Sequence, residues 1–353
     1  MYINQLTFLR FLAALLVIIF HFGKDTWPFN SATISFIVNE GSIAVSFFFF
    51  LSGLVLALNY LGKQNFSTRD FFIKRFARIY PIYIVAFLFA LILGMVINDA
   101  YPKGGSILLQ TFSLHAWFPG KCLEINFPTW SISVEVFFYL LFPALLILLR
   151  RLGKKGAVLF ILLFWAMSAG LHYLLSNYLY ISDNDKIAQF ILYFPLWHLN
   201  TFIMGILCAK FIIYKKEKEH TNFLLPRLLF LFGTISFFLI LGTDNFIKPY
   251  THNGLMSPVF FAIAAGLAID KSLLTNFLSN NLFVILGNAS YAMYIFQWPV
   301  FLSYTALIGI EKLSGYQFYV YVILLILLSI LINLTIEKKL KQVIINKWIK
   351  TKN

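Results

Sequence analysis

The sequence predicts an all-α, polytopic membrane protein with about ten transmembrane helices and with both termini in the cytoplasm. Of its 353 residues, 60% are hydrophobic and 12% are charged, whereas about a quarter of the residues in a soluble domain are charged. Apolar stretches of about 20 residues, the length that crosses a hydrocarbon core of about 30 Å, recur from Leu6 to Glu337. Membrane lipid is therefore the expected surrounding of nearly the whole chain.

Ten apolar segments, separated by polar or helix-breaking residues, are each expected to cross the membrane once. The first is expected to remain as a helix, because it carries Arg10 in its interior and lacks the basic leader of a cleavable signal. Residues 99–127 form a long outer connection with Gly and Pro residues, in which we expect a short re-entrant or interfacial helix. The ten segments lie near residues 6–22, 41–61, 79–98, 128–149, 156–176, 190–213, 228–243, 254–270, 282–305 and 316–337.

The basic residues gather on one side of these segments and predict the orientation. Of the 28 Lys and Arg residues, 21 fall in connections predicted to be cytoplasmic or in the C-terminal tail, and six fall on the opposite side. The excess of basic residues, which gives the formal charge of +14, is therefore explained by the orientation of the chain in the membrane. We expect no nucleic-acid partner. The cytoplasmic basic residues lie in 62–78, 150–155, 210–227, at position 271 and in 338–353.

Arg10 and His21 are ionisable residues within the first apolar segment, where each is costly by about 2.5–3.5 kcal/mol. A spacing of 11 residues places them on one stripe of a helix, roughly 16 Å apart along its axis. The pattern favours one group facing the cytoplasm and one facing outward. The alternative is structural: Arg10 extends to the inner headgroups, and His21 is an interfacial histidine at the helix end.

Glu135 lies at the outer end of the fourth segment, in the sequence Pro128-Thr-Trp-Ser-Ile-Ser-Val-Glu135. An unpaired carboxylate is costly in lipid, and His21 is predicted on the same side. We therefore expect Glu135 to orient and charge the imidazole of His21. The alternative is a first-turn Glu that is favoured by the helix dipole after a Ser or Thr cap.

A third polar group, made of Lys74, Arg75 and Arg78, precedes the third segment on the predicted cytoplasmic side. These residues share one helix face, and Arg binds phosphate oxygens with two hydrogen bonds at once. The alternative is that they are the basic residues which any inner helix end carries.

The ninth segment adds a polar stripe that either contacts neighbouring helices or lines a site. Its members are Asn288, Ser290, Tyr291, Tyr294 and Gln297. Metal-ligand spacing is lacking, and no metal site is expected.

In this order, these motifs resemble the acyltransferase 3 family of integral membrane acyltransferases, which includes O-antigen and peptidoglycan O-acetylases. The resemblance implies a membrane domain over residues 1–340 and a basic cytoplasmic tail over 341–353. The blocks that carry it are Arg10 and His21 with ten residues between them, Ser46-Phe-Phe-Phe-Phe-Leu-Ser-Gly53, Arg75-Phe-Ala-Arg-Ile-Tyr-Pro81, Trp130 to Glu135 and, more weakly, Leu286-Gly-Asn-Ala-Ser-Tyr291.

The resemblance further implies transfer of an acyl group, most often acetyl from acetyl-CoA, to a hydroxyl of a cell-surface polysaccharide or its lipid-linked precursor. The expected place is the bacterial cytoplasmic (inner) membrane, and no cofactor is expected to be bound permanently. His21, Glu135 and Arg10 are the expected catalytic residues, with direct transfer and an acyl-imidazole relay both open. Lys74, Arg75 and Arg78 are expected to bind the CoA phosphates. The residues expected to shape the substrate site are Trp130, Ser131, Ser133, Ser52, Ser290, Tyr291 and Gln297.

The sequence departs from the family pattern at Ala44, Leu54 and Gln297, of which Gln297 stands where many members have His. Glutamine cannot act as an acid or a base, but it can hydrogen-bond a sugar hydroxyl. The chain ends too soon for the esterase-like domain of some relatives, so transfer is expected to proceed unaided or with a separate partner. The alternatives that stay open are a glycan or small-acid transporter and an acyltransferase acting on lipids or small amines. The oligomeric state is left open.

Overall fold

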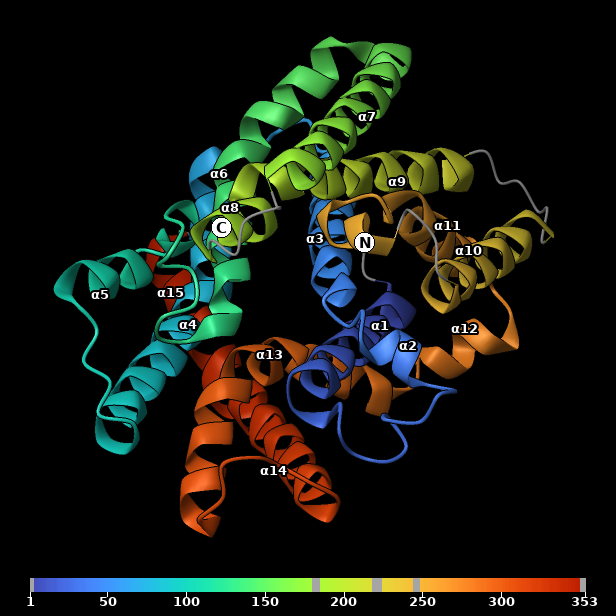
Figure 1. The fold of residues 1–353 in the computed structure, drawn as a ribbon. Helices are drawn as coiled ribbons and strands as arrows, with labels where there is room; N and C mark the ends of the chain where they lie inside the picture. The colour runs from blue at the N-terminus through green and yellow to red at the C-terminus, as the bar shows by residue number, and fades with distance from the viewer. Residues whose placement is uncertain (1–2, 180–184, 218–223, 244–247, 350–353) are drawn as a thin grey trace.

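The computed structural model describes residues 3–179, 185–217, 224–243 and 248–349, and its regular elements are all helices within these ranges. The predicted all-α fold is thereby confirmed. Figure 1 shows the helices arranged around a centre to which α1, α3, α4 and α13 contribute. The long helices are α1 (Asn4–Ile18), α3 (Ile43–Tyr60), α4 (Thr68–Ile97), α6 (Trp130–Arg151), α7 (Gly153–Leu179), α9 (Leu199–Glu217), α10 (Leu224–Gly242), α11 (Ser257–Ile269), α13 (Asn281–Ile308) and α14 (Tyr316–Ile332).

Shorter elements join or extend these helices. Two π-helical turns continue long helices: η1 (Ile19–Gly23) extends α1, and η6 (Asn333–Glu337) links α14 to α15 (Lys338–Trp348). The remaining α-helices are α2 (Ser35–Val38), α5 (Gly104–Thr111), α8 (Asp185–Tyr193) and α12 (Leu273–Leu278). The expected tail 341–353 is helical as far as Trp348, and its last four residues lie outside the described residues.

Eight helices of the described chain are long and apolar enough to span a membrane, compared with the ten segments predicted. The two others form helices that differ from that expectation. The segment 254–270 becomes α11, whose 13 residues are about 20 Å long. The segment 282–305 becomes α13, which has 28 residues and is long enough to span a membrane. Its polar stripe, which includes Asn288 and Gln297, lowers its mean hydropathy below that of the eight spanning helices. That the chain crosses the membrane ten times, and that both termini lie in the cytoplasm, remain predictions.

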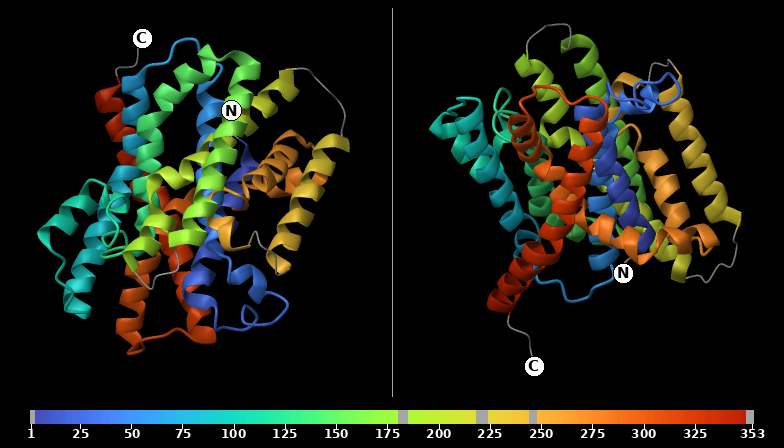
Figure 2. Two further views of the ribbon diagram at one scale, coloured as in Figure 1. Left: turned by 45° about the horizontal axis from the view of Figure 1, so that its top comes forward. Right: turned by 90° about the horizontal axis from the view of Figure 1, so that it is seen from below.

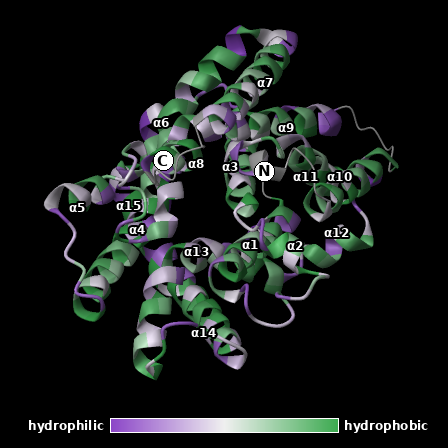
Figure 3. Ribbon diagram, viewed as in Figure 1, coloured by the Kyte–Doolittle hydropathy of each residue, from purple (hydrophilic) through white to green (hydrophobic). Residues whose placement is uncertain are grey.

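Hydrophobic residues make up most of the long helices, and hydrophilic residues gather at several helix ends and connections (Figure 3). Figure 2 shows the first helix beginning and the last helix ending toward the same side of the bundle. This arrangement agrees with two termini on one side of a membrane.

Small residues bring α3 and α9 into very close contact. A Cβ atom on Gly53 of α3 would lie 1.9 Å from the backbone oxygen of Phe202, and one on Gly205 of α9 would lie 2.0 Å from that of Phe50. Either contact is impossible for a side chain, so both crossing positions require glycine. Such small-residue contacts are a common basis of helix pairing in membranes. This pairing fixes α3, which carries Ser52, in the bundle centre.

The outer connection 99–127 contains the short helix that the sequence predicts there. This helix, α5, is joined to α4, because the hydroxyl of Tyr80 donates to the backbone oxygen of Thr111 over 2.8 Å and that of Tyr83 donates to Gln110. Figure 1 shows α5 beside α4 at the edge of the bundle. The connection then returns to the start of α6, where Gln110 donates to Thr129 over 2.5 Å.

Candidate active site

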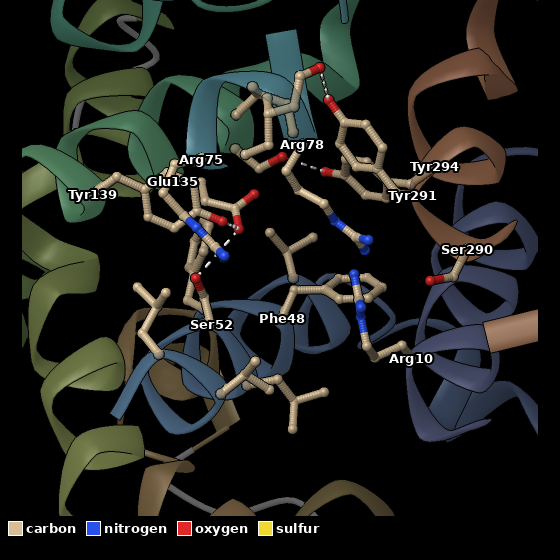
Figure 4. Close-up of a pocket in the computed structure, with 18 of the residues that line it drawn as sticks. Arg10, Phe48, Ser52, Arg75, Arg78, Glu135, Tyr139, Ser290, Tyr291 and Tyr294 are labelled. Atoms are coloured by element: carbon tan, nitrogen blue, oxygen red, sulfur yellow. Dashed lines mark hydrogen bonds between the residues drawn. The ribbon is translucent and has the colours of Figure 1, made fainter. Parts of the chain in front are cut away.

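A pocket with a volume of about 310 Å³ lies between α1, α3, α4, α6, α13 and α15 (Figure 4). This volume is at the lower end of the range for ligand-binding pockets. Sequence blocks that lie far apart along the chain meet here, since Arg10 comes from α1, Ser52 from α3 and Glu135 from α6. The described polar lining also includes Arg75, Arg78, Ser131, Ser290, Tyr291, Tyr294, Asn59, Asn288, Tyr139 and Lys341.

Cationic side chains outnumber carboxylates in this lining. Arg10, Arg75, Arg78 and Lys341 are present, against Glu135 alone among the described lining residues. The side chains of Arg10 and Arg78 point toward one another in Figure 4, and their like charges disfavour each other. The Nε atom of Arg75 is buried and has no hydrogen-bond partner among the described residues. An anion with several oxygens would satisfy these groups, so the pocket is suited to phosphate.

Arg78 is positioned by a carboxylate behind the pocket. Its Nη1 atom lies 3.6 Å from the Oε1 atom of Glu337, whose side chain is almost fully buried. The other oxygen of Glu337 accepts a hydrogen bond of 2.9 Å from Asn333, which also donates to the backbone oxygen of Asn288 over 3.2 Å. The π-turn η6 therefore links α13, α14 and Arg78 of α4. The buried carboxylate of Glu337 therefore holds the guanidinium of Arg78 in place at the pocket.

Glu135 accepts hydrogen bonds from two hydroxyl groups in the pocket. The Oγ atom of Ser52 donates to it over 3.2 Å, and the hydroxyl of Tyr139, one turn further along α6, donates over 2.5 Å. Its carboxylate lines the same pocket as the guanidinium of Arg10. In the described chain Glu135 shares no hydrogen bond with His21, so the expected contact between these two residues is not present. Glu135 instead belongs to the cationic pocket.

His21 lies outside that pocket, in the π-turn η1, where it contacts the ring of Phe127 at a centroid distance of 4.7 Å. Its Nδ1 atom lies 2.8 Å from Oε1 of Gln297. The amide nitrogen of Gln297 donates to the backbone oxygen of Tyr294 over 2.7 Å, which fixes the direction of the amide. An amide oxygen only accepts, so Nδ1 of His21 carries the proton and Nε2 is left with its lone pair. Gln297 thus orients His21 in place of Glu135.

Tyr294 and Gln297 connect the pocket with His21. Tyr294 lines the pocket and Gln297 follows it by three residues on α13, a rise of about 4.5 Å. The hydroxyl of Tyr294 donates to the backbone oxygen of Pro128 and accepts from Ser131, both over 2.9 Å. The pocket therefore ends about one helical turn from the residue that holds the imidazole.

The other predicted residues divide between the pocket and its surroundings. Ser290 and Tyr291 line the pocket, where Tyr291 donates to the backbone oxygen of Ile79 over 2.8 Å. Lys74 is not among the described lining residues, although it lies on the same turn as Arg75. Ser133 is buried outside the lining. Trp130 also packs outside it, against the rings of Phe49, Tyr193, His198 and His252.

Sequence reasoning missed three residues of the site, namely Glu337, Tyr139 and Lys341. Each had a signal in the sequence. Glu337 is an ionisable residue at the end of an apolar segment, and Lys341 and Tyr139 each follow a charged site residue by four positions, which places them on the same helix face. Groups of three or more His, Cys, Asp or Glu that could hold a metal ion are not found in the described ranges.

Comparison with known proteins identifies one family and several relatives that match this chain over part of their own length. The chain is 35% identical to the acyltransferase MdmB of Streptomyces mycarofaciens over 160 residues, which are 43% of this chain and 41% of that protein. It is 25% identical to YrhL of Bacillus subtilis, provisionally named a peptidoglycan O-acetyltransferase, over 376 aligned positions that cover 96% of this chain and 55% of the relative. A provisionally named O-acetyltransferase of Staphylococcus aureus is 24% identical over 325 positions, 85% of this chain and 50% of that protein.

The chain thus spans about half the length of the curated relatives it matches. No solved structure gives a significant match. The sequence profile of the acyltransferase domain family, acyltransferase 3, matches residues 3–337, which is nearly the whole chain. The protein therefore belongs to the acyltransferase 3 family of membrane acyltransferases.

Proposed function

We propose that the protein is a membrane O-acetyltransferase that moves an acetyl group from cytoplasmic acetyl-CoA to a hydroxyl of a cell-surface polysaccharide or its lipid-linked precursor. The observation that carries the proposal is a cationic pocket that ends about one helical turn from the residue orienting His21, whose Nε2 atom is free to accept a proton. The names of the relatives support the reaction class. The proposed location is the bacterial cytoplasmic membrane.

The donor would bind through its phosphates. Arg75, Arg78 and Lys341 come from the side of the bundle predicted to face the cytoplasm, where acetyl-CoA is available, and Arg10 of α1 points toward Arg78. A pocket of about 310 Å³ holds a part of this donor, such as its phosphates. The pantetheine arm would then extend between the helices, past Tyr294, toward His21.

The chemistry at His21 is general base catalysis. Nε2 takes the proton of the acceptor hydroxyl as the oxygen attacks the thioester carbonyl, the C–S bond breaks, and the departing thiolate receives that proton. The Gln297 amide oxygen keeps Nδ1–H in place and stabilises the imidazolium that forms during transfer. Glu135 has a different role here, because it lies in the cationic pocket with Arg10 and accepts hydrogen bonds from Ser52 and Tyr139.

The test measures transfer of radiolabelled acetyl from acetyl-CoA to surface glycan in membranes that contain the full chain. His21→Ala is expected to reduce transfer by about 10³-fold, within the range for loss of a general base. His172→Ala is the matched control, because His172 is a buried histidine on α7 that contacts the backbone of Ile191. Equal transfer by wild type and His21→Ala would refute the proposal, as would transport of acceptor with no consumption of the thioester.

A further inference from the structure

A second cavity, with a volume of about 990 Å³, lies between α6, α7, α9 and α11 and shares no lining residue with the candidate active site. Its walls are largely apolar, with Leu159 and Leu162 on α7, Leu207 and Phe211 on α9, and Phe261 on α11. Leu159 is 59% exposed and Leu162 is 43% exposed, although both lie within a helix that is apolar enough to span the membrane. The cavity is therefore a groove whose apolar walls face the hydrocarbon of the bilayer.

One end of the groove is basic. Arg150, Lys154 and Lys155 lie where α6 joins α7, and Lys210 comes from α9. Glu217 is the one carboxylate among the described lining residues. Arg150 already donates to the backbone oxygens of Tyr60 over 3.2 Å and Lys63 over 2.6 Å, so it is tied to the α3–α4 connection. Arg150 keeps its positive charge, and the three lysines are the other cations that line the groove.

Lys210 lies further from the end of its helix than the other basic residues of the groove. It lies seven residues before Glu217, the last residue of α9, and is thus about 10 Å deeper along the helix. It is half-buried, its charge is disfavoured by that of Lys154, and it forms no ion pair with a carboxylate in the described chain. An ionisable group at such a depth needs a partner. An anion placed between Lys154 and Lys210 would supply it.

We propose that this groove binds an anionic glycerophospholipid of the cytoplasmic leaflet. The phosphate would lie between Lys154 and Lys210, with Lys155 beside it, and an acyl chain would cover the wall formed by Leu159, Leu162 and Phe211. A small soluble anion would leave that wall bare, and a zwitterionic lipid would bring its own cation near the lysines. Basic pockets between membrane helices on the cytoplasmic side are typical sites for acidic headgroups. The proposal is independent of the acetyl-transfer chemistry.

The experiment is native mass spectrometry of the full chain in detergent, titrated separately with phosphatidylglycerol and phosphatidylcholine of the same acyl chains. Wild type is expected to bind one phosphatidylglycerol more tightly than any phosphatidylcholine. Lys154→Gln and Lys210→Gln are each expected to weaken this binding about fivefold, as for the loss of one surface lysine near an anionic lipid. Lys154→Arg with Lys210→Arg keeps both charges and is expected to retain it.

The control is Lys338→Gln with Lys339→Gln, which removes two exposed charges from α15 outside the groove and is expected to leave the tight site unchanged. The melting temperature of each variant reports whether it is folded. The proposal is overturned if phosphatidylglycerol binding is the same in wild type and the folded Lys154→Gln/Lys210→Gln variant. It is also overturned if long-chain acyl-CoA displaces the bound lipid one for one, since the groove would then be a donor site.

Discussion

Nδ1 of His21 and Oε1 of Gln297 lie 2.8 Å apart, and this contact joins the first membrane helix to the polar stripe of α13. The amide nitrogen of Gln297 is committed to the backbone oxygen of Tyr294, so the amide cannot rotate without losing a hydrogen bond. Gln297 thus sets the tautomer of the proposed base.

Gln297→Leu is expected to lower kcat for acetyl transfer by about 10²-fold, because the imidazole loses the acceptor that keeps its proton on Nδ1. Gln297→Glu retains an acceptor at the same place and is expected to keep more activity than the leucine variant. Gln317→Leu, which removes a glutamine at the start of α14, is the control for a change of side-chain polarity. Equal kcat values for Gln297→Leu and wild type would exclude the orienting role.

The arginines of the pocket are expected to act on the donor. Arg75→Ala and Arg78→Ala should each raise the KM for acetyl-CoA about tenfold or more, since a hydrogen bond to a charged group contributes about 1.5–3 kcal/mol. Lys74→Ala removes a neighbouring charge from outside the pocket lining, and its KM is expected to change little. Steady-state kinetics, with the donor varied at fixed acceptor and the acceptor varied at fixed donor, distinguish these cases. If KM rises equally for donor and acceptor, the variants have a folding or topology defect and the phosphate role is wrong.

The crossing of α3 and α9 is expected to tolerate no side chain at Gly53. Gly53→Ala places a Cβ atom 1.9 Å from the backbone oxygen of Phe202, so the helices must separate at a cost of about 1–3 kcal/mol or more. Gly105→Ala in α5 adds the same methyl group where no atom lies within 4 Å. Melting temperatures in detergent should fall for the first variant and stay near wild type for the second. Equal melting temperatures would show that this crossing is looser than described.

The folded protein is expected to lose stability in mild acid because of His115, which lies in the outer connection. Burial lowers the pKa of His115 from 6.5 to about 4, so the folded protein binds this proton less readily than the unfolded chain. No stability is lost through this group above pH 6.5, and the loss grows as the pH falls from 6.5 toward 4, where it reaches about 3 kcal/mol.

His115→Asn removes this titrating group, and its melting temperature is expected to fall less than that of wild type between pH 7.5 and 5. Some acid sensitivity should persist, because burial also lowers the pKa of His252 to about 4. Parallel melting curves for wild type and variant over this range would contradict the assignment to His115.

Much of the fold could be predicted from hydropathy, because a chain in lipid must satisfy its backbone within each helix. The limit of this reasoning appears at α11 and α13. Hydropathy marks apolar length, whereas α13 is held inside the bundle by contacts with α1 and α14 and can therefore carry Asn288, Ser290 and Gln297. A polar stripe that faces protein lowers hydropathy without excluding the helix from the bundle.

For the candidate site too, part of the outcome could be predicted from the sequence and part could not. The sequence singles out Arg10, His21, Arg75, Arg78 and Glu135 as candidates, since each is an ionisable residue within or beside an apolar segment. Their grouping was not visible. Helical periodicity relates residues on one helix, but the contact of His21 with Gln297 and that of Arg78 with Glu337 each join separate helices.

The sequence by itself determined the helical class, the apolar segments, the basic bias of one side and the residues with unusual chemistry, because these follow from local composition and helix geometry. Only the tertiary structure decided that Glu135 belongs with the arginines and that Gln297 holds His21. The physical reason is that hydrogen bonds and charge interactions act over a few ångströms. The distances between side chains of different helices are fixed by how closely those helices pack, as at Gly53 and Gly205.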